Sequence, residues 1–220
     1  MKIFLDTASI KEIKKWMATG LVDGVTTNPS LISKEKGDAK KIIKEICKLV
    51  KDGDVSVEVT EKDPKKVYAQ AQKIAKIAKN VVVKIPCHPD YFEVIKKLVD
   101  KKINLNITLV FSVLQGMMMC KLGVKYISPF IGRLDDVDCD GLDLVANLRQ
   151  MIDEYVFLNT KIIAASIRGM RHFHEVALLG ADVATVPSAV LEKAAHHPLT
   201  DKGIKKFLED WKKLKIKIFP

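Results

Sequence analysis

Short apolar runs alternate with longer amphipathic segments along the whole chain. The runs are rich in Val and Ile and are bounded by Gly, Pro or charged residues, which is typical of buried strands. We expect eight strands, at Lys2–Asp6, Asp23–Thr27, Val55–Val59, Val81–Ile85, Ile103–Leu109, Val124–Ile131, Lys161–Ser166 and Asp182–Val186. Helical spacing of apolar residues lies between them, for instance at Ile10–Thr19, Pro64–Lys79, Tyr91–Lys102, Leu142–Val156 and Met170–Leu179, and a last helix is expected over Asp201–Leu214.

Eight strand-helix units in sequence predict a (β/α)8 TIM barrel with an additional C-terminal helix. An open, doubly wound sheet is the alternative. The chain contains neither a G-x-G-x-x-G nor a G-x-x-x-x-G-K-[ST] motif, so dinucleotide and P-loop sites have no support. No linker rich in Pro, Gly or Ser interrupts the pattern, and we expect one domain over residues 1–220.

Polar residues occupy alternate positions near the ends of several expected strands. Because side chains on a strand alternate between two faces, Ser56 and Glu58 lie opposite the neighbouring valines, and Lys84 shares its face with Val82. The same reasoning collects one interior set: Asp6, Glu58, Lys84, Asn106 and Thr108. Barrel enzymes build their sites at the C-terminal ends of strands, so this set is a candidate active site. A salt-bridge cluster that fixes the register of the barrel is the alternative.

Lys84 lies between Val81-Val82-Val83 and Ile85-Pro86, an apolar frame that disfavours the charged ammonium and favours a reactive free amine. Such a lysine is a candidate for a Schiff base with a ketone. A lysine whose ammonium reaches solvent is the alternative for an isolated residue, but the inward polar neighbours favour chemistry. The carboxylates of Asp6 and Glu58 would carry the protons in such a reaction.

Three polar residues lie at or just after the ends of the sixth and seventh expected strands: Arg133, Ser166 and Arg168. The planar guanidinium group can hold phosphate oxygens in pairs, so these residues indicate a phosphorylated substrate. An arginine that only lies on the surface is the alternative for each of the two.

Composition narrows the class of protein. The net charge of +10 could attract nucleic acid, an anionic surface or a phosphorylated metabolite, but only 6% of the residues are aromatic and no RNA-binding signature is present. The four cysteines form no C-x-x-C pair, and the five histidines do not converge, so we expect reduced thiols, no metal and no cofactor. No apolar run is long enough for a membrane span, and an acid at position 6 argues against a signal peptide. We therefore expect a cytoplasmic protein without nucleic-acid or membrane partners.

Several ordered blocks resemble the small transaldolases, the group that includes the fructose-6-phosphate aldolases. The blocks are FLDTA at 4–8, DGVTTNP at 23–29, VEV at 57–59, VKIP at 83–86, NITLVFS at 106–112, ISPFIGR at 127–133, ASIR at 165–168 and FLEDW at 207–211. The chain departs from that pattern at Cys87-His88-Pro89-Asp90-Tyr91 and at Gly169.

The resemblance implies a transaldolase of the pentose phosphate pathway. Sedoheptulose 7-phosphate would give a dihydroxyacetone unit to glyceraldehyde 3-phosphate, forming erythrose 4-phosphate and fructose 6-phosphate. By the same resemblance, Lys84 forms the imine, Asp6 is the acid/base for the C4 hydroxyl, and Glu58 with Thr108 activates water. The implied substrate-binding residues are Thr26, Asn28, Asn106, Ser128, Phe130, Arg133, Ser166 and Arg168.

A fructose-6-phosphate aldolase that releases free dihydroxyacetone is the alternative. That branch carries Gln and Tyr where this chain has Glu58 and Phe130, and a phenyl ring cannot donate a hydrogen bond to water. We therefore expect the transferase. The resemblance also implies a homo-oligomer, a pentamer or decamer, in which the C-terminal helix packs on a neighbour.

Overall fold

Eight parallel strands close into a barrel in chain order, which confirms the expected (β/α)8 TIM barrel with an additional C-terminal helix. The structure is a computed structural model and describes residues 1–213. Its strands are β1 (Lys2–Asp6), β2 (Gly24–Thr26), β3 (Asp54–Glu58), β4 (Val81–Pro86), β5 (Leu105–Val110), β6 (Tyr126–Pro129), β7 (Lys161–Ala164) and β8 (Val183–Val186). β1 pairs with both β2 and β8, so the sheet has no open edge.

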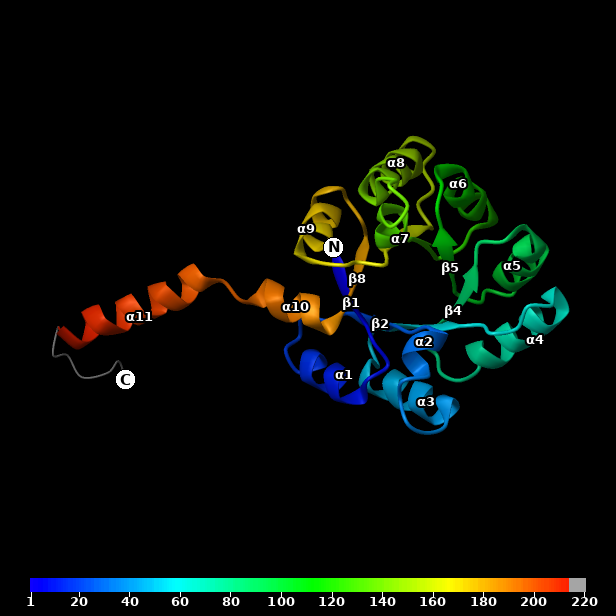
Figure 1. The fold of residues 1–220 in the computed structure, drawn as a ribbon. Coiled ribbons are helices and arrows are strands. Elements are labelled where there is room, and N and C mark those ends of the chain that lie inside the picture. Colours follow the sequence, from blue (N-terminus) through cyan, green and yellow to red (C-terminus); the bar gives the residue numbers. More distant parts are fainter. Residues whose placement is uncertain (214–220) are drawn as a thin grey trace.

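Helices surround the barrel on its outer side (Figure 1). The helices of the chain are α1 (Ile10–Met17), α2 (Pro29–Ile32), α3 (Ala39–Leu49), α4 (Pro64–Ala75), α5 (Phe92–Asp100), α6 (Val113–Leu122), α7 (Ile131–Asp135), α8 (Gly141–Glu154), α9 (Met170–Leu178), α10 (Ser188–Ala195) and α11 (Pro198–Lys213), with a 3₁₀ turn at Pro89–Tyr91, and all but α11 lie around the barrel. Side-chain oxygens of Ser9, Asp38, Asp63, Ser112 and Asp140 accept hydrogen bonds from the first turns of α1, α3, α4, α6 and α8. Such caps satisfy N–H groups that have no partner within the helix.

The interior of the barrel has two levels. Its floor is an apolar cluster apart from the main core, made of Phe4, Val82, Tyr126, Ile163 and Val183. Side chains alternate along a strand, so the residue two positions further along each strand faces the same interior, nearer the C-terminal end. These residues are Asp6, Lys84, Ser128, Ala165 and Thr185. The reactive level therefore lies on a packed apolar layer.

Gly24 of β2 is required by this floor. A Cβ atom at that position would lie 2.5 Å from a ring carbon of Phe4 and 2.7 Å from the carbonyl oxygen of Asp54. Both distances are far below van der Waals contact, so only glycine lets Phe4 fill the centre of the barrel.

One expected boundary that differs is the end of the sixth strand. We expected Val124–Ile131, but β6 ends at Pro129 and Ile131 begins α7. Phe130 still pairs with Ala165, and the N–H groups of Ile131 and Gly132 then donate to the carbonyls of Ala165 and Ser166. These bonds join the two loops that follow β6 and β7.

The fifth and seventh strands are also less regular than expected. Leu109 has a φ of 56°, and the register to β6 shifts between Ile107 and Val110, so the expected alternation through Leu109 is wrong. The seventh strand ends at Ala164 instead of Ser166, because Ser166 has a φ of 60° in the left-handed region and cannot continue an extended strand.

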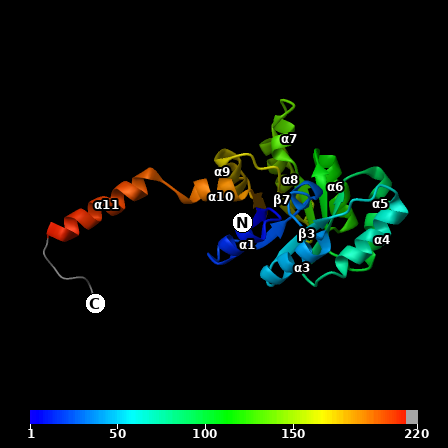
Figure 2. The ribbon, with the colours of Figure 1, turned by 60° about the horizontal axis from the view of Figure 1, so that its bottom comes forward.

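The last helix projects away from the barrel. α11 begins at Pro198, three residues before the expected start, and Leu214, the expected end, lies outside the described residues. Two views show α11 extending beyond α10 with the barrel on the other side (Figures 1 and 2). None of its residues is buried.

Candidate active site

A cavity of about 230 Å³ opens at the C-terminal end of the barrel. It is lined by Asp6, Thr26, Asn28, Lys84, Asn106, Ser128, Phe130, Arg133, Ala165, Ser166, Arg168 and Thr185. The structure thus brings ten of the twelve sequence-predicted site residues to one cavity, from six strands or the loops after them. Glu58 and Thr108 are the other two, and they lie on the strands on either side of Lys84.

Lys84 lies at the centre of this arrangement. Its side chain is only 6% exposed, and its Nζ atom lies 3.2 Å from Oε2 of Glu58. Nζ also donates to the carbonyl oxygen of Thr27 at 3.4 Å, and it lies 5.9 Å from the centre of the Phe130 ring. A nearly buried ammonium needs such partners, because desolvation of an unpaired charge is costly. A carboxylate at this distance can also take a proton from the amine.

Asp6 is the second carboxyl group of the cavity. Burial raises the pKa of Asp6 above its ordinary value, although the hydrogen bond from Thr26 and the charge of Lys84 both lower it, and Glu58 raises it further. Thr26 Oγ1 donates to Oδ1 of Asp6 at 2.8 Å and lies 2.5 Å from the hydroxyl of Thr185. The result is a carboxyl group that holds its proton more tightly than an exposed aspartate.

Thr185 was not singled out from the sequence. It is a buried hydroxyl between Ala184 and Val186 on β8, directly above Val183 of the floor. The available signal was a single polar residue in an otherwise apolar strand. The alternation of side chains between two faces, which located Lys84 and Asn106, also places Thr185 in the interior.

Asn106 and Ser128 form a buried polar pair on the opposite side of the cavity. Ser128 Oγ donates to Oδ1 of Asn106 at 2.7 Å, and Asn106 Nδ2 donates to the hydroxyl of Ser56 at 3.2 Å. All three are buried, and Asn106 lies beside Lys84 in the register of β4 and β5. These bonds fix the orientation of the amide next to the amine.

Thr108 is different from its neighbours. It is fully buried, and within the described part of the chain its hydroxyl has no hydrogen-bond partner. A buried hydroxyl without a partner costs free energy, so such a group in a native fold calls for an external partner such as substrate or water.

Asn28 is the N-cap residue of α2. Its Oδ1 atom accepts a hydrogen bond from the N–H group of Leu31 at 2.9 Å. Because the oxygen faces the first turn of α2, the side-chain NH₂ group is the part of Asn28 that can donate to a ligand in the cavity.

Two arginines lie at the mouth of the cavity. The guanidinium carbon of Arg133 lies 5.2 Å from the centre of the Phe130 ring. Arg168 donates through Nη2 to Oδ2 of Asp136 at 2.5 Å and to the carbonyl of Gly132 at 3.4 Å. Both arginines are exposed, so an incoming anion can reach them and can replace Asp136 as the partner of Arg168.

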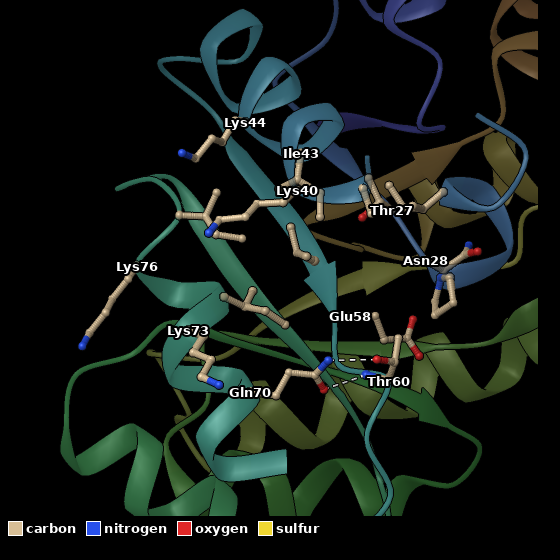
Figure 3. A pocket seen from close by; sticks show the side chains of 16 residues that line it. Thr27, Asn28, Lys40, Ile43, Lys44, Glu58, Thr60, Gln70, Lys73 and Lys76 are labelled. Atoms are coloured by element: carbon tan, nitrogen blue, oxygen red, sulfur yellow. Dashed lines mark hydrogen bonds between the residues drawn. The ribbon is translucent and has the colours of Figure 1, made fainter. Parts of the chain in front are cut away.

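A larger cavity of about 640 Å³ lies outside the barrel, between α3 and α4. Lys44 of α3 and Lys76, which follows α4, lie on one side of it, while Asn28 and Glu58 lie on the side of the barrel mouth (Figure 3). Its walls are mainly aliphatic side chains and lysine stems. Asn28 lines both cavities, so the larger one adjoins the edge of the smaller.

The thiol that follows β4 has no reactive character. Burial raises the pKa of Cys87 to about 11, so this thiol is protonated at neutral pH and is a poor nucleophile. Three of the four cysteines are buried and free, and Cys139 is exposed and free.

Among residues 1–213, no group of three or more His, Cys, Asp or Glu residues is arranged to hold a metal ion. The part of the chain described also contains no helix long and apolar enough to cross a bilayer.

Comparison with solved structures supports the fold. A double variant of flavocytochrome b2 with sulfite bound aligns with a TM-score of 0.59, covering 85% of this chain and 56% of that one. The two are 11% identical in sequence, so the likeness concerns the fold alone.

Sequence comparison finds relatives that are much more similar to this chain. Proteins named probable transaldolase from Desulfosudis oleivorans and Parvibaculum lavamentivorans are 51% and 50% identical to this chain. The alignments cover 98% and 99% of the chain and the full length of both relatives. A third, from Lactiplantibacillus plantarum, is 51% identical over 96% of the chain and 97% of its own length. The family model described as Transaldolase/Fructose-6-phosphate aldolase matches residues 3–218, and the chain therefore belongs to this family of enzymes.

Proposed function

We propose that this protein is a transaldolase in which Lys84 forms a Schiff base with a ketose phosphate. The observation that carries the proposal is the pairing of a nearly buried Lys84 with Glu58 at 3.2 Å, in a barrel mouth that also holds Asp6. A shielded amine between two carboxyl groups meets the needs of imine chemistry, in which a nucleophile and two separate proton carriers act in turn.

The first half of the reaction forms the imine. Glu58 takes a proton from the Lys84 ammonium, and the free amine attacks the C2 carbonyl of the ketose. The resulting carbinolamine loses water when Glu58 returns a proton to the departing hydroxyl. The unpartnered hydroxyl of Thr108 is suited to hold this water, because it lies on the strand next to Lys84 and has no other acceptor or donor within the described residues.

The second half breaks and remakes a carbon-carbon bond. Asp6 takes the proton of the C4 hydroxyl while the C3–C4 bond breaks, and the electron pair moves into the imine to give an enamine. An aldose phosphate leaves, and another aldose takes its place. The same steps in reverse form the new bond, and hydrolysis of the imine then releases the new ketose.

Polar side chains around these groups would bind the rest of the substrate. Asn28 and Asn106 would hold substrate hydroxyls, and Thr26 and Ser128 would bind the dihydroxyacetone unit. Arg133, Ser166 and Arg168 would bind the phosphate. The support for the phosphate site is two exposed guanidinium groups and a hydroxyl around one cavity.

The expected reaction is transfer between sedoheptulose 7-phosphate and glyceraldehyde 3-phosphate, within the pentose phosphate pathway. Phe130 supports transfer over simple aldol cleavage, since its ring lies above Lys84 and offers no hydroxyl to direct water. The proposal fails if free dihydroxyacetone forms from fructose 6-phosphate faster than transfer to erythrose 4-phosphate.

We also propose one domain over residues 1–220, a cytoplasmic location, and a homo-oligomer, pentamer or decamer, in which α11 packs on a neighbouring copy. The support for the last point is the exposure of four large apolar side chains on α11: Leu199, Ile204, Phe207 and Leu208. Light scattering should report a single oligomer for the chain and a smaller species for a Phe207→Glu, Leu208→Glu variant.

The decisive experiment traps the imine. The protein is reduced with borohydride in the presence of fructose 6-phosphate, and the modified peptide is identified by mass spectrometry. We expect the adduct on Lys84 and its loss, together with turnover, in Lys84→Met. An adduct on another residue, or full turnover in the variant, overturns the proposal.

A further inference from the structure

The loop that follows β7 carries Ser166 and Arg168, and it is held in a strained shape. Ser166 has a φ of 60°, a left-handed conformation that a residue with a Cβ rarely adopts. Its carbonyl accepts a hydrogen bond from Gly132 at 3.1 Å, and Ile167 is buried in the core. Contacts with the rest of the fold must therefore hold the loop in place.

Gly132 makes room for the arginine. A Cβ atom there would lie 2.6 Å from two atoms of the Arg168 side chain. Because glycine has none, the stem of Arg168 lies directly over the chain, and its guanidinium group reaches the Gly132 carbonyl and Asp136. The stem of Arg168 is thus packed against the backbone at Gly132 between the loop and the mouth of the cavity.

The backbone of Arg168 is held by a histidine. Gly169 precedes the first residue of α9 and offers no side chain to cap the helix. His172, at the third position of α9, reaches back, and its Nδ1 atom accepts a hydrogen bond from the backbone N–H of Arg168 at 3.3 Å. The imidazole therefore satisfies an N–H group just before a helix whose N-cap residue has no side chain.

The other side of the imidazole is also engaged. Its Nε2 atom lies 2.8 Å from Oδ2 of Asp135, and Oδ1 of the same carboxylate accepts from the N–H of Gly141 at 3.1 Å. Since Nδ1 acts as an acceptor, the hydrogen of the neutral ring lies on Nε2 and is donated to Asp135. The side chain of His172 is 14% exposed, so the ring is fixed in one orientation.

We propose that His172, oriented by Asp135, is a positioning residue that holds Arg168 where it binds the phosphate group of the substrate. The inference rests on the proposed function, because it concerns the phosphate-binding side of that site. When substrate binds, the guanidinium group of Arg168 releases Asp136 and pairs with the phosphate. The hydrogen bond from the backbone N–H of Arg168 to His172 meanwhile holds the backbone of this residue in place.

The test uses inorganic phosphate as the probe, followed by ³¹P NMR titration, because this readout does not require sugar turnover. Asparagine places an oxygen where Nδ1 of histidine lies, whereas glutamine places a donor near Nε2. We expect His172→Ala and His172→Gln to weaken phosphate binding about tenfold, and His172→Asn to stay within about twofold of the wild type. Arg168→Gln is the positive control, and His174→Ala, an exposed histidine of the same helix, is the matched negative control.

A kinetic measurement separates positioning from general damage. With saturating donor, kcat/KM of His172→Ala should fall about tenfold for glyceraldehyde 3-phosphate and stay near the wild-type value for unphosphorylated glyceraldehyde. Gly169→Asn should restore part of the loss in the His172→Ala background, because a Cβ atom at this position would meet no atom within 4 Å and an asparagine can cap α9.

Each result has one meaning. Unchanged phosphate affinity in His172→Ala, or equal loss for both glyceraldehydes, overturns the inference. So does a His172→Asn variant as weak as His172→Ala, or a wild type that binds no phosphate. Failure of the proposed function is recognised separately, as absence of the Lys84 adduct in a protein whose phosphate binding still depends on His172.

Discussion

The ammonium of Lys84 lies 3.2 Å from the Glu58 carboxylate, and the two residues are direct neighbours in the register of β4 and β3. The backbones of Glu58 and Lys84 are therefore fixed relative to each other, because the two residues lie on hydrogen-bonded neighbouring strands. Glu58 is 15% exposed and Lys84 is 6% exposed, so the proton between them is shielded from most of the solvent.

Glu58→Gln should lower kcat by about 10² to 10⁴, the usual contribution of a positioned acid/base group. The amide keeps the shape of the side chain but cannot take a proton from Lys84. The rate of borohydride trapping with fructose 6-phosphate should fall as well, while the adduct stays on Lys84. Glu61→Gln, at an exposed position on the following loop, is the control. Turnover within threefold of the wild type in Glu58→Gln would remove Glu58 from the mechanism.

Asp6→Asn should inactivate the enzyme and stabilise the fold. The native pKa of Asp6 is raised by burial, so the folded protein binds this proton more tightly than the unfolded chain. Stability of the wild type therefore falls as the pH rises from the unfolded pKa of about 3.8 through the native pKa. The variant has no such slope, and the difference in Tm should be positive at pH 7 and shrink as the pH approaches 4.

Thermal unfolding at several pH values, with transfer kinetics at pH 7, checks this expectation. Asp52→Asn, at an exposed position, should change neither quantity. A Tm of Asp6→Asn below that of the wild type at pH 7 would mean that the ionised carboxylate stabilises the fold, contrary to the direction of its pKa.

Thr108→Val should reduce activity without a loss of stability. The variant keeps the shape of the side chain and removes a buried hydroxyl that has no partner within the described residues, which is neutral or stabilising. Thr160→Val is the contrasting control, because the buried Thr160 hydroxyl donates to the Val124 carbonyl at 2.7 Å and its removal should cost about 1 to 3 kcal/mol. Denaturant unfolding and steady-state kinetics measure both. A clear destabilisation by Thr108→Val would show that its hydroxyl has a structural task.

Much of the site followed from the two-residue period of strands. Asp6 above Phe4 and Lys84 above Val82 are placed by the sequence alone, since the period and the strand ends determine both the face and the level. Thr185 obeys the same rule above Val183 and was overlooked, because threonine is common on strands whose faces are both buried.

The loops could not be derived in this way. The start of α7 at Ile131 depends on hydrogen bonds to Ala165 and Ser166, which lie more than thirty residues away in the sequence. The contact between His172 and the backbone of Arg168 lies in a loop where Ser166 takes a left-handed conformation that its residue type does not predict. Local propensity carries no information on either, because both result from the closure of the barrel around two neighbouring loops.

Phe130→Tyr should shift the enzyme from transfer toward release of dihydroxyacetone. The ring of Phe130 lies 5.9 Å from Lys84 Nζ and forms part of the cavity wall, so a para-hydroxyl would place a hydrogen-bond donor and acceptor at the edge of the imine site. Such a group can orient water for attack on the covalent intermediate, and one hydrogen bond of about 1.4 kcal/mol corresponds to a tenfold rate change. The ratio of free dihydroxyacetone from fructose 6-phosphate to transfer onto erythrose 4-phosphate should therefore rise about tenfold. Phe111→Tyr is the matched control, because that ring packs edge to face on Phe130 at 6.1 Å and is partly exposed to solvent, so its added hydroxyl should leave the ratio unchanged. If both variants change the ratio equally, the effect comes from altered packing of the two rings and the hydroxyl of residue 130 does not select between the reactions.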